Sequence, residues 1–140
     1  MRRMRRVPIR FNDQDAQGHV NHLGILEYVA EARIAALDRF VRRAGADGLD
    51  YVLVNIEADF IKEMKYPGWV EVDFRITAVG KKSVTTEYEV VYKNSNGWTE
   101  GGGPAAKARC VNVFFDTASG KTVPVPEKLR KLMEKEIDDG

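Results

Sequence analysis

Hydrophobic and polar residues follow two different rhythms along the chain, and the change of rhythm divides it into elements. From Gly24 to Phe40, apolar residues recur every three or four positions, which predicts one long helix with a buried face. The segments after this helix alternate between apolar and polar at every second position, which is typical of half-buried strands. We expect these strands over Tyr51–Phe60, Trp69–Val79, Ser83–Tyr92 and Ala105–Phe115.

Shorter segments complete the pattern at the two ends of the chain. Val7–Asn12 predicts a short first strand, and Glu127–Ile137 predicts a charged C-terminal helix. We interpret the arginines ahead of the first strand as a solvated tail, because they have no aromatic partners and the net charge is balanced. In the strand after the long helix, strict alternation predicts one face made of Val52, Val54, Ile56, Ala58 and Phe60.

These elements predict an α+β protein with one antiparallel sheet wrapped around one long helix. Consecutive strands that are joined by short turns pair antiparallel. A sheet with one apolar face and a single apolar helix can bury both by packing against each other. Because neither a repeat nor a linker interrupts the pattern, we expect a single domain over residues 1–140. The other face and the sheet edges would remain available to a partner subunit.

Composition narrows the class of protein further. Hydrophobic residues make up 44% of the 140 residues, enough for a buried core. Lys and Arg (22) almost balance Asp and Glu (21), which argues against a nucleic-acid binder. No apolar run approaches the roughly 18 residues that cross a bilayer, so we expect no membrane span. A single cysteine, Cys110, forms no intrachain disulfide, which fits a cytoplasmic location.

Candidate chemistry is concentrated immediately before the long helix. Asp13 and Asp15 precede a glycine turn at Gly18, and Asn21 or His22 stands where the helix would be capped. The start of a helix offers unpaired N–H groups and partial positive charge, both suited to a developing oxyanion. A carboxylate close to it can act as a base or as a nucleophile.

The order of elements, with D-x-D-x-x-G-H-V-N-H directly before the helix, resembles the hotdog-fold acyl-CoA thioesterases. The closest group is the 4-hydroxybenzoyl-CoA thioesterase family. The resemblance covers nearly the whole chain and is carried by Asp13, Asp15, Gly18, His19, Val20 and Asn21, and then by Tyr28, Glu31, Ala32 and Arg33. Looser matches are Ala58–Phe60, Pro67–Gly68, Val79–Ser83, and Phe115–Asp116 leading to Val123–Pro126.

The resemblance implies hydrolysis of acyl-CoA at sites shared between subunits of a homodimer or homotetramer, without a cofactor. It assigns the catalytic carboxylate to Asp15 and the oxyanion contact to the backbone N–H of His22. Many relatives have Asn where His22 stands, but a backbone contact tolerates that change. Asp15 could activate water or attack the thioester directly, and the sequence leaves both mechanisms open.

Other residues are expected around the substrate or in support of the site. We place Gly18, Asn21, Tyr28 and Glu31 beside the substrate, and assign Lys81 and Lys82 to the phosphates of CoA. Glu31 is also interpreted as the partner of a basic side chain. Asp13 is expected to support the structure of the site.

Several alternatives stay open or are set aside. An acyl-carrier-protein thioesterase would have the same fold, as would a non-catalytic acyl-CoA-binding dimer. A hotdog dehydratase is disfavoured because its His-x-x-x-x-Pro-Gly type of loop is absent. His19 and His22 lack a recognised metal-ligand spacing, so we expect no metal site. Cys110 lies in a predicted strand and is interpreted as a packing residue.

Overall fold

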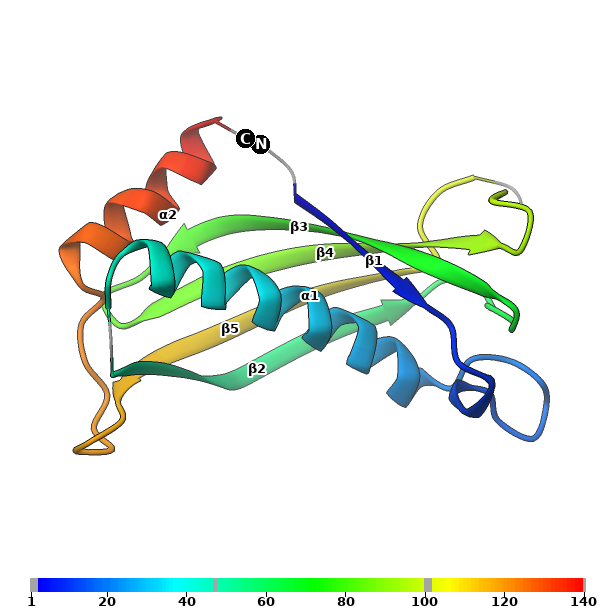
Figure 1. The fold of residues 1–140 in the computed structure, drawn as a ribbon, viewed down its shortest axis with the longest axis horizontal. Coiled ribbons are helices and arrows are strands. Elements are labelled where there is room, and N and C mark those ends of the chain that lie inside the picture. The colour runs from blue at the N-terminus through cyan, green and yellow to red at the C-terminus, as the bar shows by residue number, and fades with distance from the viewer. Residues whose placement is uncertain (1–2, 47, 100–101, 140) are drawn as a thin grey trace.

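The computed structural model describes residues 3–46, 48–99 and 102–139, and its five strands form one antiparallel sheet (Figure 1). The strands are β1 (Arg3–Pro8), β2 (Leu49–Phe60), β3 (Gly68–Val79), β4 (Ser83–Asn94) and β5 (Ala106–Asp116). Their order across the sheet is β1-β3-β4-β5-β2. The predicted strands are therefore present, but β2 pairs with β5 rather than with β3, the next strand along the chain. The sheet thus has β1 and β2 as its two edges.

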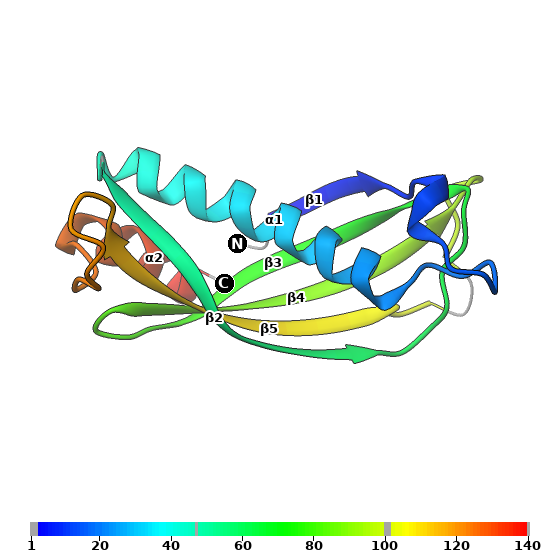
Figure 2. The same ribbon diagram turned by 90° about the horizontal axis from the view of Figure 1, so that it is seen from below.

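The long helix α1 (His22–Arg43) lies along one face of the sheet (Figure 2). It begins two residues earlier than the apolar spacing predicts, because Asn21 caps it by accepting a hydrogen bond from the Leu23 N–H. Ala44 ends the helix, and Gly45 follows in a left-handed conformation that glycine adopts without strain. Its buried stripe has the predicted helical period and consists of Gly24, Ile25, Tyr28, Val29, Ala32, Arg33, Ala36, Leu37 and Phe40.

The inner face of the sheet, the face that packs against α1, supplies the other half of the core. Each strand from β3 to β5 alternates buried inner residues with more exposed outer ones, as predicted. Helix α2 (Glu127–Asp139) packs against β3 and α1 through the fully buried side chains of Leu129 and Met133. Arg130 on α2 donates a hydrogen bond of 2.6 Å to the Gly80 carbonyl, which fixes the helix to the β3–β4 turn.

The first strand was predicted at the wrong position. Val7–Asn12 was expected to be extended, but β1 ends at Pro8, and Phe11–Asp13 form a short 3-10 turn. Arg5 and Arg6, expected in a solvated tail, belong to β1 and pair with β3. Arg5 forms an ion pair with Glu31 of α1, and the Arg6 guanidinium lies 3.9 Å from the centre of the Trp69 ring. The expectation that these arginines have no aromatic partner is therefore wrong for Arg6. Because this segment is rich in arginine, the pattern of hydrophobic residues did not indicate a strand here.

The strict alternation predicted for β2 is interrupted by a bulge. The pairing register with β5 shifts between Leu53 and Asn55, so Val54 has no partner of its own. Beyond the bulge, Ile56, Ala58 and Phe60 face inward, together with Tyr51 and Leu53 from before it. Val52 is therefore on the opposite face from Ile56, which corrects the predicted single apolar face. Because β2 is also an edge, Val52, Val54, Ile56 and Phe60 remain exposed.

Candidate active site

The loop that joins β1 to α1 is fixed to the sheet by backbone hydrogen bonds. The Ile9 N–H donates to the Gly68 carbonyl over 2.9 Å, and the Val20 N–H donates to the Met64 carbonyl over 2.8 Å. The Asn21 N–H donates to the Asp13 carbonyl over 2.8 Å, which closes the loop on itself. Backbone hydrogen bonds therefore fix the loop at Ile9, Val20 and Asn21.

Asp13 is the buried anchor of this loop. Its carboxylate accepts hydrogen bonds from the Arg10 N–H (2.9 Å), the Arg10 guanidinium (3.0 Å) and the Tyr28 hydroxyl (2.7 Å). Burial on its own would raise the pKa of Asp13, but these hydrogen bonds outweigh it and lower the pKa below its ordinary value. Asp13 is therefore occupied in holding the loop against α1, in keeping with its expected supporting role.

Asp15 lies two residues further on and is exposed. Its backbone N–H donates to the His19 carbonyl over 2.9 Å, and its Oδ1 accepts from the Gln17 N–H over 2.9 Å. The Gly18 N–H donates to the Asp15 carbonyl, and Gly18 takes the left-handed conformation that this tight turn requires. One carboxylate oxygen thus shapes the turn, while the exposed carboxyl group is accessible to a reactant.

The start of α1 provides the second chemical element. The Asn21 side chain satisfies the Leu23 N–H, and the Ile25 N–H donates to the Asn21 carbonyl. The N–H of His22, the first helical residue, has no acceptor in the described part of the chain. An unpaired N–H at a helix start is a ready hydrogen-bond donor for an oxyanion.

A groove of about 480 Å³ opens beside the helix start. Its walls come from the loop and α1 on one side and from the end of β2 on the other: His19, Val20, His22, Ile25, Phe60, Ile61, Lys62 and Glu63. The His22 ring meets the Phe60 ring edge-on, with 6.0 Å between the ring centres. His19 Nε2 lies 3.1 Å from a Glu63 carboxylate oxygen. Asp15 does not line the groove, but its hydrogen bond to His19 places it directly next to the wall.

The structure separates the predicted site residues into two groups. Asp15, Gly18, Asn21 and His22 share one loop and the helix start. Tyr28 is buried, and its hydroxyl is bound to Asp13, so within this chain it does not face the groove. Glu31 forms an ion pair of 3.3 Å with Arg5 of β1, on the far flank of α1 from β2.

Lys81 and Lys82 lie in the turn between β3 and β4. Because Gly68 at the start of β3 binds the β1–α1 loop, this turn is at the opposite end of the sheet from Asp15. The twelve residues of β3 correspond to roughly 40 Å of strand. The two lysines therefore cannot meet a substrate bound at Asp15 of the same chain.

Sequence reasoning missed the β2 side of the groove. Phe60, Ile61, Lys62 and Glu63 follow a long strand, and nothing local in the sequence marks them as site residues. Their role depends on β2 lying at the sheet edge beside the helix start. The only local signal is the pair of exposed apolar residues, Phe60 and Ile61, directly before two charges.

A second hollow, of about 270 Å³, lies over strands β2 to β5 and is lined mainly by outer-face charges. It includes the Arg75–Glu87 ion pair (3.0 Å) and is rich in carboxylates. Because it is not at the helix start, we do not assign the substrate to it.

In the described residues, no three His, Cys, Asp or Glu side chains are grouped in a way that could hold a metal ion. None of the described helices is long and apolar enough to span a bilayer.

The fold and the site define the class of protein. A five-stranded antiparallel sheet, packed against one long helix whose start carries the candidate site, is the hotdog fold. A family model described as the thioesterase-like superfamily matches residues 9–133. The chain therefore belongs to the thioesterase-like superfamily. A comparison with curated proteins finds no match.

Solved structures support the same assignment. The chain is similar to a thioesterase from Thermus thermophilus, complexed with coenzyme A and zinc, with 30% identity, a TM-score of 0.75, and coverage of 91% of this chain and 94% of that one. A predicted thioesterase from Bacillus stearothermophilus has a TM-score of 0.83 at 22% identity, with coverage of 98% and 97%. A thioesterase-superfamily protein from Jannaschia has a TM-score of 0.79 at 20% identity, with coverage of 96% and 82%. At these lower identities the likeness shows the fold alone.

These comparisons support thioester hydrolysis as the general activity. They do not single out the 4-hydroxybenzoyl-CoA group, so that narrower resemblance stays a prediction. The cytoplasmic location stays a prediction as well.

Proposed function

We propose that this protein hydrolyses acyl-CoA thioesters, with Asp15 as the catalytic carboxylate and the His22 N–H as the oxyanion donor. The observation that carries the proposal is the groove between the helix start and the end of β2, with an exposed carboxylate directly next to it. The choice of CoA as thiol carrier is supported by the Thermus relative, which binds coenzyme A.

The chemistry requires one nucleophilic oxygen and one stabilised oxyanion. Asp15 either takes a proton from water or attacks the carbonyl carbon to form an anhydride that water opens. In both routes the carbonyl oxygen becomes negative and is stabilised by the His22 N–H and the positive end of α1. The C–S bond then breaks, and the CoA thiolate takes up a proton from solvent. A thiolate is a good leaving group, so no strong general acid is needed.

A homodimer would complete the groove. Val54 on β2 is 56% exposed and Phe60 is 49% exposed, on a sheet edge with unpaired backbone groups. On α1, the neighbouring flank adds Leu23 and Ile34, which are also exposed. An exposed apolar edge of this length is normally covered by a partner. We propose that two β2 strands pair antiparallel across a two-fold axis, as part of a homodimer or a homotetramer.

In the proposed dimer, Lys81 and Lys82 can contact a substrate that is bound to the other subunit. Antiparallel pairing of the two β2 strands reverses the second sheet end to end. The partner subunit's Lys81 and the partner subunit's Lys82 then lie at the same end of the assembly as Asp15. From there they can contact the phosphates of CoA, with the thioester in the groove of the first subunit.

A steady-state assay with purified protein tests the proposal. A panel of acyl-CoAs and the matching acyl-carrier-protein thioesters would be supplied, and release of free thiol followed. We expect turnover of acyl-CoA with a higher kcat/KM than for the same acyl group on the carrier protein. A preference for the carrier protein would favour the alternative thioesterase. Tight acyl-CoA binding without thiol release would favour a non-catalytic acyl-CoA-binding dimer and contradict the proposal.

A further inference from the structure

Two buried polar side chains on the inner side of the sheet lack the partners that buried groups normally have. Asn112 on β5 is fully buried, and among the described residues neither its amide nitrogen nor its amide oxygen has a hydrogen-bond partner. Arg33 on α1 is only 9% exposed, and its Nε is also without a partner. Within the described part of the chain, no carboxylate forms an ion pair with Arg33.

The two side chains belong to one polar region of the core. Asn112 and Cys110 are on the same face of β5, two residues apart, and Cys110 pairs with Thr86 of β4. Burial raises the pKa of the Cys110 thiol, and the positive charge of nearby Arg33 partly offsets that rise. Thr86 and Tyr88 bond each other through their hydroxyls at 2.8 Å, so they already have a partner.

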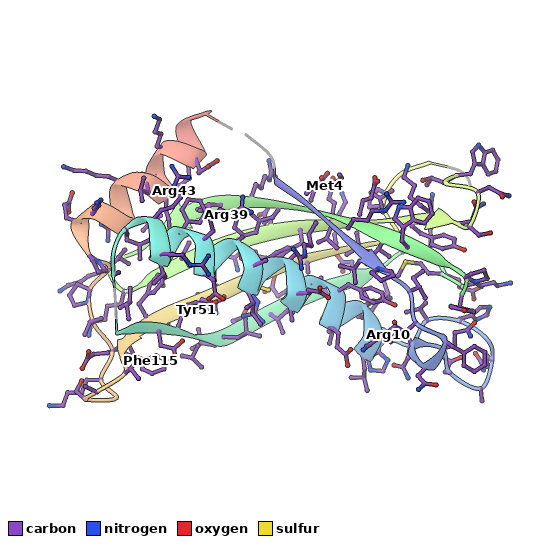
Figure 3. All side chains as sticks on the ribbon, viewed as in Figure 1. Met4, Arg10, Arg39, Arg43, Tyr51 and Phe115 are labelled. Carbon is purple, nitrogen blue, oxygen red and sulfur yellow. The ribbon has the colours of Figure 1, made fainter. Side chains whose placement is uncertain are left out.

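This region lies along the seam between α1 and β2, which we define as running from His22 beside Phe60 to Asp38 beside Tyr51. The Tyr51 hydroxyl on β2 bonds the Asp38 carboxylate and contacts the Ile34 carbonyl, and Figure 3 shows Tyr51 on the edge of the sheet next to α1. At the other end, His22 and Phe60 line the groove of the proposed active site. Arg33 therefore lies further along the same seam in which the groove begins.

Leaving the Asn112 amide and the Arg33 guanidinium unpaired would lower the stability of the folded protein. A buried amide without a hydrogen bond, and above all a buried cation without a counter-charge, destabilises the fold unless something binds it. Between the groove and Arg33 the apolar residues are Ile25 and Phe60, which line the groove, and Ile56, which faces inward from β2. The polar pair is thus a discrete feature at a distance from the reacting centre.

We propose that Arg33 and Asn112 bind a carboxylate at the far end of the substrate's acyl group. This inference rests on the proposed function and adds the substrate class: thioesters of dicarboxylic acids. An acyl chain that enters at the groove would lie along the apolar part of the seam. Its terminal carboxylate would accept hydrogen bonds from the Arg33 guanidinium and the Asn112 amide N–H.

The spacing along α1 suits a medium-length chain. Arg33 is eleven positions after His22, which corresponds to about 16 Å along the helix axis. Side chains on a helix lean towards its N-terminus, so the guanidinium lies closer to the oxyanion donor than this value. A plain fatty acyl chain of the same length would leave both polar groups unpaired, and such sites discriminate strongly against the analogue that lacks the polar group.

Kinetics on a matched substrate pair test the inference. Suberoyl-CoA and octanoyl-CoA have chains of equal length and differ only in the terminal carboxylate. We expect the wild type to prefer suberoyl-CoA by at least about tenfold in kcat/KM, as a charge-assisted hydrogen bond predicts. Arg33→Met and Asn112→Leu, each close in shape to the original, should abolish the preference by lowering the value for suberoyl-CoA alone. Arg39→Met removes the same charge from an exposed position on α1 and should keep the preference.

A binding measurement separates this inference from the proposed function. Free suberate should raise the Tm of the wild type but not of Asn112→Leu, and octanoate should not show this difference. If no thioester is hydrolysed but suberate still stabilises only the wild type, the proposed function fails and the carboxylate site stands. Equal kcat/KM for both substrates, unchanged in the variants, together with no effect of suberate would overturn the inference. In that case the two groups hold only buried water or a partner subunit's side chain.

Discussion

Two aspartates of one short motif have opposite environments. Asp13 is buried and accepts hydrogen bonds from Arg10 and Tyr28, whereas Asp15 is exposed on the turn beside the groove. If the first strand continued through Asp15, the two aspartates, which are two positions apart, would lie on the same face of the sheet. The 3-10 turn that ends at Asp13 breaks that relation, so one carboxylate holds the loop and the other remains available.

The buried carboxylate predicts how stability depends on pH. The pKa of Asp13 is lower in the folded protein than its ordinary value of 3.8, so the ionised form stabilises the fold above that value. This contribution is lost as the pH falls through the folded-state pKa. At neutral pH, Asp13→Asn should cost about 1–3 kcal/mol of unfolding free energy. Between about pH 5 and pH 2 the wild type should lose stability more steeply than the variant. Denaturant unfolding at several pH values would measure both.

Tyr28→Phe is the companion variant for this prediction. It removes the hydroxyl that donates to Asp13 but leaves the carboxylate and the three hydrogen bonds from Arg10. We expect a loss of about 1–2 kcal/mol at neutral pH, with the steep acid slope retained. Parallel pH curves for the wild type and Asp13→Asn would show that Asp13 does not carry the stabilisation assigned to it.

At the scale of elements, the start of α1 combines a structural and a catalytic role. Asn21 caps the helix through its side chain and thereby fixes where the free His22 N–H lies. Asn21→Ala should destabilise the protein by about 1 kcal/mol, the usual value of an N-cap, and lower the Tm by a few degrees. Thermal unfolding followed by circular dichroism would measure this. Asn12→Ala, the same change at an exposed position in the preceding turn, should leave the Tm nearly unchanged; an equal loss in both variants would remove the capping explanation.

Periodicity predicted the long elements well, because each is long enough for its burial pattern to dominate. The helix α1 and strands β3 to β5 were predicted to within a few residues at each end. The errors occur where backbone pairing rather than side-chain burial decides the structure. β1 is held by its backbone bonds to β3 despite its arginines, and the bulge at Val54 follows from the register with β5. Both β1 and the bulge depend on pairing with a strand that is distant in the sequence, so the residues of the segment itself do not predict them.

For the whole molecule, the decisive feature that the sequence did not predict is the position of β2. Its place at the edge brings Phe60 and Ile61 beside the helix start and so forms the groove. Because β2 is an edge strand, some of its apolar side chains are also exposed. The motif from Asp15 to His22 could be located from the sequence, but its second wall and the remoteness of Lys81 and Lys82 follow only from the strand order.

The exposed β2 edge predicts the oligomeric state. Val54→Lys places a charge at the bulge, which would be desolvated in a dimer formed through β2. We expect its dimer dissociation constant to rise by at least about tenfold, while the monomer stays folded. Met4→Lys is the matched control, because Met4 is equally exposed but lies on β1, the other edge of the sheet (Figure 3). Light scattering over a dilution series would show the shift. Dissociation caused by the Met4 variant instead would assign the interface to β1.

The central claim is that Asp15 is the catalytic carboxylate, and kcat of Asp15→Asn on the best acyl-CoA tests it most directly. The amide keeps the shape and can still accept the Gln17 N–H, but it can act neither as base nor as nucleophile. We predict that kcat falls by at least about a hundredfold, while KM and the oligomeric state change little. Asp13→Asn should lose more stability and less activity. Near-normal kcat in Asp15→Asn, with activity abolished in Asp13→Asn or Glu31→Gln, would contradict the account.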